Sequence, residues 1–390
     1  DFCLSRGLGD VYKRQVRACQ KCHACSSDGC GYAICSTLAK KADCSVPLDA
    51  LHLIAWYARE FQQTDPENWR EHLKESLDEY TDPITAAGTQ LVRGAAATTI
   101  SDLIVRDSNR IAVFLPALEH LVEDSSLAVR ACTASALTAI FRHDPETALS
   151  LFLKLCQAED LLLQTFPVEH FFPNAFRTHY SQLQPILARM LQSPIKSVQR
   201  SGARLACVAA LITEHAQATA DACLYGTEAQ RIGAAEIYAA HFSDSSFRTR
   251  CESALMRLFN DPSEQVRTQT TKCFQNWSGE QLSHGDAFLD AFVQSLAFRT
   301  NPYPFLQTLK ETILQLPEIT YLACEKYITE LSTESDFHQY RKMNAIEPLI
   351  VRLYSQQKSA SLRTRCLDLI DRILQYDAHE LVQTLQEYDR

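Results

Sequence analysis

The chain has 390 residues, of which 46% are hydrophobic and only 11 are glycine, and its formal net charge is −9. This length exceeds one compact core, so it indicates either several domains or an elongated repeat protein. The negative charge argues against nucleic-acid binding through bulk electrostatics, and the lack of any run of 18 apolar residues argues against a membrane span. The abundance of Ala, Leu, Gln, Glu and Arg, without alternating β-branched runs, predicts helix throughout.

The first fifteen residues, "DFCLSRGLGDVYKRQ", differ from the rest of the chain. They contain no methionine, the first being Met190, and no apolar segment of a signal peptide follows them. The stretch resembles translated adapter sequence, and a natural linker is the alternative. We therefore expect 1–15 to be a non-native or disordered leader. We expect the remainder to be the C-terminal part of a larger protein, and the protein to be cytoplasmic.

Residues 16–45 form a cysteine-rich segment that holds six of the chain's 15 cysteines. Four of them are closely spaced: Cys19, Cys22, Cys25 and Cys30. Four thiolates at such intervals satisfy tetrahedral zinc, and His23 could replace one of them. However, zinc modules usually pair two C-x-x-C elements, and no second one exists here. Two interpretations stay open: a zinc or redox site, or the last turns of a helix followed by a turn. No other cofactor is indicated.

The next region, 46–277, contains a repeated helix pattern. Stretches that begin at residues 91, 128, 197, 229, 265 and 361 share one phase, and five of the six have an apolar second residue. Arg follows that position at once in five of them, while Gln199 separates Val198 from Arg200. Apolar or small residues recur at offsets of 4, 7 or 8, and 11, as on one face of an amphipathic helix. The predicted repeat core comprises Val92, Val129, Leu137, Val198, Leu205, Ile237, Val266, Phe274, Leu362 and Ile370.

The repeat spacing and the turn residues resemble those of HEAT repeats. Val92 lies 37 residues before Val129, and Val198 lies 32 before Gln230, which is room for two helices and a turn. "LMRLFNDPSEQVRTQ" shows the typical order of a first helix, a turn with Asp and Pro, and "VR" in the second helix. The resemblance implies an all-α, HEAT-like α-solenoid in which antiparallel helix pairs stack into a superhelix. It covers 46–277, with further helical repeats and a C-terminal cap at 278–390.

A more particular resemblance involves "GYAICSTLAKKADCSVPLDALHLIAWYAREFQQTDPENW", "LEHLVEDSSLAVRACTASAL" and "RSGARLACVAALI". These stretches are similar to the C-terminal helical region of bacterial STAND-type NTPases, including NACHT-related proteins. The resemblance implies the sensor or autoinhibitory arm of such a protein, possible work in anti-phage defence, and an NTPase domain upstream. The sequence itself has no G-x-x-x-x-G-K-[ST] motif, and the family supplies no catalytic residue to transfer.

Two segments interrupt the repeat with aromatic residues and proline. Residues 165–185 contain Phe171, Phe172 and Phe176, and 298–309 contain Tyr303 and Phe305. Exposed aromatic residues anchor protein interfaces, so these five residues are candidates for binding a partner. The alternative is a packed, non-standard repeat, because aromatic side chains are usually buried.

The sequence favours a scaffold for protein–protein interaction that is not an enzyme, with another protein as its ligand. It contains neither H-E-x-x-H nor G-x-S-x-G, and no catalytic or cofactor-binding residue is assigned. A HEAT-like nucleic-acid-binding or DNA-repair module is an alternative, and the zinc or redox element described above is another. The nucleic-acid alternative depends on the basic residues near the C-terminal end: Arg341, Lys342, Arg352, Lys358, Arg363 and Arg365.

Overall fold

The protein is described by a computed structural model of residues 18–19, 21, 23, 28–40, 46–75, 82–275, 286–313, 315–331 and 345–375. Within these residues the chain forms 20 α-helices and four short 3-10 helices, and no strand occurs among them. The predicted all-α class is therefore confirmed. The chain divides into two compact units, and the boundary lies between Ala216 and Gln217. This boundary falls inside the 46–277 range that the sequence predicts as one block of repeats.

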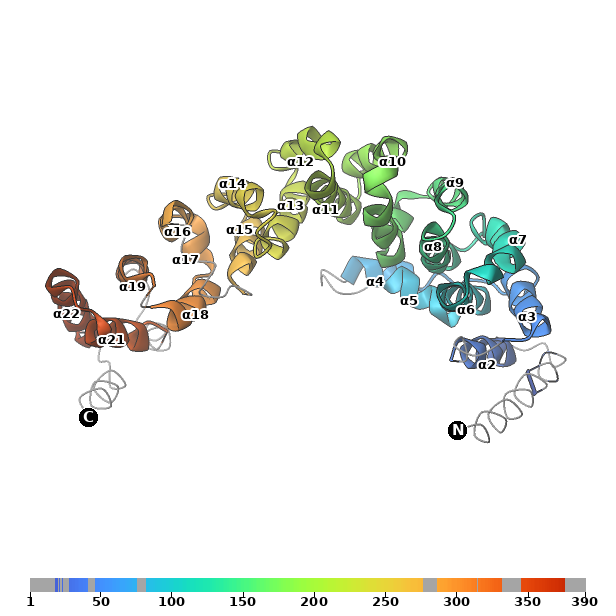
Figure 1. The fold of residues 1–390 in the computed structure, drawn as a ribbon, viewed down its shortest axis with the longest axis horizontal. Helices are drawn as coiled ribbons and strands as arrows, with labels where there is room; N and C mark the ends of the chain where they lie inside the picture. Colours follow the sequence, from blue (N-terminus) through green and yellow to red (C-terminus); the bar gives the residue numbers. More distant parts are fainter. Residues whose placement is uncertain are drawn as a thin grey trace. The chain divides into compact units, whose positions relative to one another are not determined.

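Both units consist of short helices joined by turns (Figure 1). The helices of the first unit are α2 (Asp28–Ala39), α3 (Leu48–Arg59), α4 (Trp69–Glu75), α5 (Pro83–Gln90), α6 (Val92–Arg106), α7 (Ile111–Leu121), α8 (Leu127–Phe141), α9 (Pro145–Leu155), α10 (Phe166–Gln192) and α11 (Lys196–Ile212). Those of the second are α12 (Gln217–Cys223), α13 (Glu228–Ala240), α14 (Arg248–Leu258), α15 (Glu264–Thr271), α16 (Asp286–Val293), α17 (Leu296–Thr300), α18 (Tyr303–Thr312), α19 (Pro317–Leu331), α21 (Glu347–Gln356) and α22 (Ala360–Leu374).

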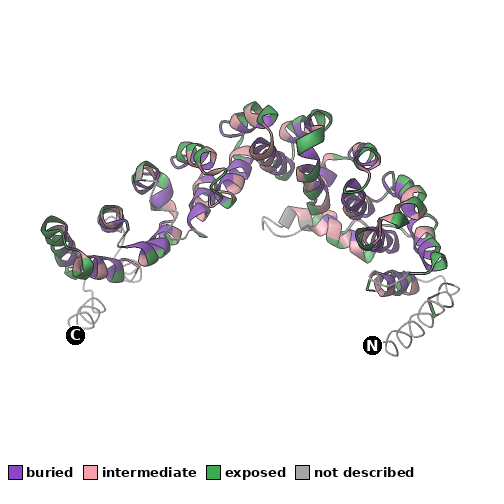
Figure 2. Ribbon diagram, in the orientation of Figure 1, coloured by how far each residue is buried: buried purple, intermediate pink, exposed green. Residues whose placement is uncertain are grey.

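Helix α8 lies at the centre of the first unit. It packs against α6, α7, α9, α10 and α5, and 13 of its 15 residues are buried (Figure 2). Ser126 caps its N-terminus by accepting a hydrogen bond from the Val129 amide. Its many alanines allow neighbouring helices to approach closely from several directions, which a strictly amphipathic helix could not accommodate.

Helix α5 belongs to an insertion between α3 and α6, yet it packs on α8. One glycine allows this contact, and a second allows α6 to approach α5. A Cβ atom at Gly88 would lie 2.2 Å from the Ala128 carbonyl oxygen, and one at Gly94 would lie 2.0 Å from the Gly88 carbonyl oxygen. Asp82 caps α5 by accepting from the Thr85 amide and also accepts from the Phe166 amide at the start of α10. The insertion therefore joins three neighbouring parts of the unit.

The second unit is built from successive helix pairs. Helix α13 packs against α12, α14 and α15, α15 packs against α17, and α19 packs against α16, α21 and α22. A short 3-10 helix at Lys272–Phe274 continues α15 and contacts α18. A main-chain hydrogen bond of 2.9 Å from the Ala297 amide to the Phe259 carbonyl oxygen links one pair to the next. This pairing of neighbours is consistent with the predicted helical repeat.

The structure places nine of the ten predicted core residues in the interior. The tenth, Ile237, is only half-buried, while Tyr238 beside it is 1% exposed and Ala234 is fully buried. The prediction of Ile237 was wrong by one position. Counted from Gln230, an offset of 7 or 8 residues allows either Ile237 or Tyr238 as the core residue. In α13 the face that points inward passes through Ala234 and Tyr238.

The aromatic segment 165–185 folds into the long helix α10. Phe171, Phe172 and Phe176 are each 0% exposed, and the Phe171 ring stacks on the Phe152 ring at 3.8 Å. These three residues belong to the core, which corrects the expectation that they form a binding surface. The helix bends at His179, whose φ of −129° is not helical.

Candidate functional site

Two arginines of the repeat pattern, Arg93 and Arg231, form ion pairs that join neighbouring helix pairs. The Arg93 Nε donates to Asp124 Oδ2 at 2.7 Å, and Arg93 Nη2 donates to Asp124 Oδ1 at 3.1 Å. Arg93 Nη1 also donates to the carbonyl oxygens of Phe61 and Gln63. The Asp124 carboxylate accepts from the Ser126 amide as well, so one buried ion pair fixes two loops and the start of α8.

The second unit contains the same network. Arg231 Nε donates to Asp261 Oδ2 at 2.6 Å, and Asp261 Oδ1 accepts from the Ser263 amide at 2.8 Å. The next arginine of the repeat pattern, Arg267, donates to the Asp261 carbonyl oxygen, just as Arg130 donates to that of Asp124. Arg and Asp are separated by 31 residues in the first copy and by 30 in the second. The two copies thus share the ion pair and the turn around its Asp, while the spacing to the Arg differs by one residue.

A third copy, at the turn between α10 and α11, has no charged groups. Ser193 stands in the Asp position and accepts from the Ile195 amide, and Gln199 stands in the Arg position and donates to the Ser193 carbonyl oxygen at 2.7 Å. Leu162 and Leu163 occupy the positions 30 and 31 residues before Ser193 and are buried. The amide side chain of Gln199 therefore preserves the shape of the turn where the repeat lacks its arginine.

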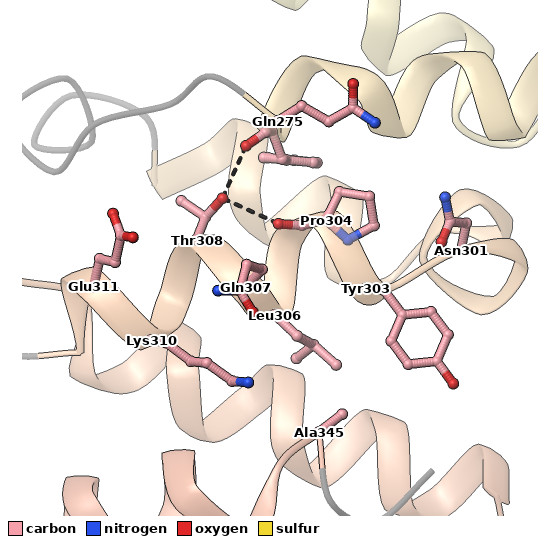
Figure 3. A pocket seen from close by; sticks show the side chains of 11 residues that line it. Gln275, Asn301, Tyr303, Pro304, Leu306, Gln307, Thr308, Lys310, Glu311 and Ala345 are labelled. Atoms are coloured by element: carbon pink, nitrogen blue, oxygen red, sulfur yellow. Dashed lines mark hydrogen bonds between the residues drawn. The ribbon is translucent and has the colours of Figure 1, made fainter. Parts of the chain in front are cut away.

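A hollow in the described surface lies on α18 in the second unit. It is an open cleft of about 480 Å³ (Figure 3). Helix α18 forms its floor, and the end of the 3-10 helix after α15 and the residue Ala345 before α21 border it. Its lining residues are Phe274, Gln275, Asn301, Tyr303, Pro304, Leu306, Gln307, Thr308, Lys310, Glu311 and Ala345.

The floor of the cleft is rigidly attached to the core. Phe305 and Leu309 are 0% exposed on the inner face of α18, and the Phe305 ring lies 4.8 Å from the Phe274 ring. Thr308 Oγ1 donates to the Phe274 carbonyl oxygen at 2.9 Å, one of the two dashed contacts of Figure 3. On the other side, Arg352 Nη1 of α21 donates to the Lys310 carbonyl oxygen at 2.9 Å. Side chains on the outer face of α18 are thereby held at fixed positions.

The groups that point into the cleft are hydrogen-bonding groups with few charges. The side-chain amides of Gln275, Asn301 and Gln307 can each donate and accept, as a peptide group does. The Tyr303 hydroxyl oxygen accepts from the Tyr327 hydroxyl at 3.4 Å, which leaves the Tyr303 proton available to a ligand. The charged lining side chains are Lys310 and Glu311, and they extend in different directions in Figure 3.

Of the two aromatic residues predicted at 298–309, one lines this cleft. Tyr303 is 48% exposed and belongs to its floor, whereas Phe305 is 0% exposed and forms the layer beneath. The prediction of Phe305 as an interface residue was therefore wrong, because residues two apart on a helix do not share a face. The amides of Gln275, Asn301 and Gln307 were missed. Exposed amides carry no periodic signal, although the neighbouring "NPYP" indicates an irregular turn at this place.

The predicted zinc ligands are only partly described. Cys19 is buried and Cys30 is half-buried, while Cys22 and Cys25 lie outside the described residues, as does the leader 1–15. Among the described residues, no three His, Cys, Asp or Glu side chains are arranged to hold a metal ion. The zinc site therefore stays a prediction.

The remaining described cysteines behave as buried apolar residues, as predicted for Cys132, Cys273 and Cys366. Burial raises the pKa of the Cys132 thiol to about 12 and that of the Cys366 thiol to about 11. Desolvation of the thiolate is the main cause in both. These thiols are protonated at neutral pH and are poor nucleophiles.

The basic residues near the C-terminal end are largely engaged within the fold. Arg365 Nη1 donates to Glu318 Oε2 at 2.8 Å, and its guanidinium lies 4.0 Å from the centre of the Tyr321 ring. The Arg363 guanidinium lies 4.9 Å from the centre of the Tyr354 ring. Arg341 and Lys342 lie outside the described residues. A search of the helices in the described part of the chain finds none long and apolar enough to cross a membrane.

Comparisons with known proteins add little to this picture. No protein-family model and no curated protein matches the sequence. Among solved structures, an engineered protein whose crystal structure was determined by the Northeast Structural Genomics Consortium aligns with 92% of this chain and 98% of its own. The sequence identity is 14% and the TM-score is 0.27, and a match at this level carries no argument about fold or function.

Proposed function

We propose that this chain is a non-catalytic helical-repeat protein that binds a segment of another polypeptide in the α18 cleft. The observation that carries the proposal is the lining of the cleft, in which three side-chain amides and an exposed tyrosine surround an open trough. Side-chain amides match the paired donor and acceptor of a peptide bond, and tyrosine supplies contact area at low entropic cost. The volume is within the range of specific binding sites.

Two features favour a polypeptide over a nucleic acid or a reacting substrate. The cleft has one cationic and one anionic lining side chain, whereas a phosphate backbone is bound by several cations. Its lining contains no Cys, His or Ser, and the Thr308 hydroxyl is already bonded to two main-chain carbonyl groups, so an activated nucleophile is not evident.

The repeated Arg–Asp network supports a finer proposal, that the helix pairs form a HEAT-like solenoid. Two similar copies, in which Arg and Asp are separated by 31 and by 30 residues, are expected if each pair repeats one structural unit against its neighbour. The resemblance of 31–245 to the sensor region of STAND-type NTPases further suggests that the bound polypeptide is a signal for a larger protein. A DNA-binding role is less favoured because the described C-terminal arginines are held within the fold.

The proposal can be tested by selecting ligands and then removing the cleft. Random peptides displayed on phage are selected on the full chain, and the synthetic consensus peptide is titrated into wild type, Gln307→Ala and Tyr303→Ala by fluorescence anisotropy. Tyr225→Ala is the matched control, because Tyr225 is 71% exposed in the same unit but outside the cleft. We expect each cleft variant to weaken binding by about tenfold or more, as for anchors of an interface, and the control to bind normally. Selection of no peptide, or equal binding by all four proteins, contradicts the proposal.

A further inference from the structure

The floor of the cleft presents an aromatic ring and a cation along one line of α18. Tyr303 and Lys310 are seven residues apart, which is two helical turns and about 10.5 Å along the axis. Leu306 lies between them but is 1% exposed, so the exposed side chain between them is that of Gln307. The line therefore reads aromatic, amide and cationic, with its two ends about 10 Å apart.

Lys310 is positioned to receive an anion from outside the chain. Its side chain is half-buried, and it forms no ion pair among the described residues. The Glu311 carboxylate extends in a different direction in Figure 3. Arg352 does not line the cleft, and its guanidinium is bonded to the Lys310 carbonyl oxygen. A partly desolvated ammonium group without a carboxylate partner gains more from an incoming anion than an exposed one does. The charge of this end of the cleft therefore complements a carboxylate.

The spacing of the two ends restricts the conformation of the ligand. A polyproline II segment rises about 3.1 Å per residue and repeats its side-chain direction every three residues, so that residues i and i+3 lie about 9 Å apart on one edge. A β-strand would place residues i and i+3 on opposite faces. Of these two conformations, only polyproline II places residues i and i+3 of the ligand on one edge at a distance close to that between Tyr303 and Lys310.

We propose that the α18 cleft recognises an acidic segment in an extended, polyproline II-like conformation. An apolar or proline side chain packs on the Tyr303 ring, and an Asp or Glu three residues away binds the Lys310 ammonium group. The amides of Gln275 and Gln307 bond the main chain of the segment. This inference rests on the proposed function and adds to it the chemistry and the spacing of the ligand.

The selected peptides test both parts of this inference. We expect their consensus to contain an Asp or Glu three positions from a proline or an apolar residue. Lys310→Gln should weaken binding of the consensus peptide by about tenfold, which is the effect expected when a charge-assisted hydrogen bond is lost. Lys358→Gln removes the same charge from an exposed position of the same unit outside the cleft and should change nothing. Raising the salt concentration from about 0.05 to about 0.5 M should weaken peptide binding by wild type several-fold, and peptide binding by Lys310→Gln much less.

The outcomes separate this inference from the proposed function. If the selected peptides depend on Tyr303 and Gln307 but lack an acidic residue, or bind Lys310→Gln as well as wild type, the inference is overturned while the proposed function stands. A spacing of seven residues instead of three indicates a helical ligand and also overturns it. If no peptide depends on any cleft residue, both fail. Equal thermal unfolding of wild type and Lys310→Gln excludes misfolding as the cause of a loss.

Discussion

The Arg93 guanidinium and the Asp124 carboxylate meet at two points, with Nε to Oδ2 at 2.7 Å and Nη2 to Oδ1 at 3.1 Å, and their side chains are only 10% and 4% exposed. A paired charge at this depth is tolerated because each group satisfies the other. Removal of one partner leaves the other buried and uncompensated. The pair therefore fixes the relative positions of two loops that are far apart in the sequence.

Arg93→Gln should lower the free energy of unfolding of the first unit by about 3–5 kcal/mol, because it leaves the Asp124 carboxylate buried without its cation. The measurement is urea denaturation followed by circular dichroism. Arg59→Gln is the matched control, since Arg59 pairs with Glu60 at the surface, where the two side chains are 43% and 49% exposed. We expect a change of less than about 1 kcal/mol there. Similar losses in the two variants would show that the buried pair has no special role.

Gly88→Ala should destabilise the first unit by about 1–3 kcal/mol, because the new methyl group would meet the Ala128 carbonyl oxygen at 2.2 Å and a backbone atom cannot rotate away. Gly29→Ala provides the contrast. No atom lies within 4 Å of a Cβ at Gly29, and alanine is the better helix former, so that variant should be neutral or slightly more stable. Thermal unfolding of both variants checks the prediction, and a stable Gly88→Ala protein would mean that α5 does not pack as described.

Val129→Asp should unfold the first unit or lower its stability by about 4 kcal/mol or more, because it places an unpaired carboxylate in a fully buried position of α8. Val105→Asp introduces the same change on α6 at a site that is 50% exposed, and it should be tolerated. Val266→Asp should act in the same way as Val129→Asp on the second unit. Hydrogen exchange measured by mass spectrometry shows which unit loses protection. The predicted repeat register is contradicted if the loss is not confined to the substituted unit, or if all three substitutions are tolerated equally.

The stability of the protein should fall at alkaline pH through its buried thiols. Burial raises the pKa of Cys132 from 9.0 to about 12, so the folded state keeps a proton that the unfolded state loses above pH 9. The contribution of Cys132 is therefore fully present below pH 9 and is lost as the pH rises toward 12. Each such thiol lowers the free energy of unfolding by about 1.4 kcal/mol for each pH unit in this range.

Cys132→Ser tests this slope, because the serine hydroxyl keeps a donor near the Thr85 carbonyl oxygen but does not titrate. Urea midpoints of wild type and variant are compared from neutral pH to pH 11. Lysine and tyrosine titrate in both proteins and cancel in the difference. The difference in urea midpoint between the two proteins should stay constant below pH 9. Above pH 9 the midpoint of wild type should fall relative to that of the variant. Parallel curves across the whole range would refute the assigned role of Cys132.

Much of the helical framework was readable from the sequence. The repeated "VR" marked the starts of α6, α8 and α15, and the apolar stripe located nine of ten core residues correctly. Even the departure at Gln199 had a structural meaning, since its amide replaces an arginine at the same turn. Local patterns succeed here because capping and helix periodicity depend on neighbours in the chain.

The features that failed depend on distant residues. Nothing near Gly88 in the sequence shows that α5 reaches Ala128, and composition alone could not place Phe171 and Phe172 inside the core rather than on a surface. The α18 cleft is likewise assembled from three separate stretches around Phe274, Tyr303 and Ala345. Periodicity identifies which residues share a helix face, but it does not say what that face meets.

The packing of α5 limits how this protein could be lengthened or shortened. Helical-repeat proteins usually grow by duplication of whole units, because each unit contacts only its neighbours. Helix α5 precedes α6 in the chain but fits against α8, so a copy of α6 inserted before α8 would separate Gly88 from the Ala128 carbonyl group beside which it packs. The second unit has a comparable constraint, because α16 packs against α19 across α17 and α18. A change in length within either unit therefore has to preserve a contact between helices that are not adjacent in the chain.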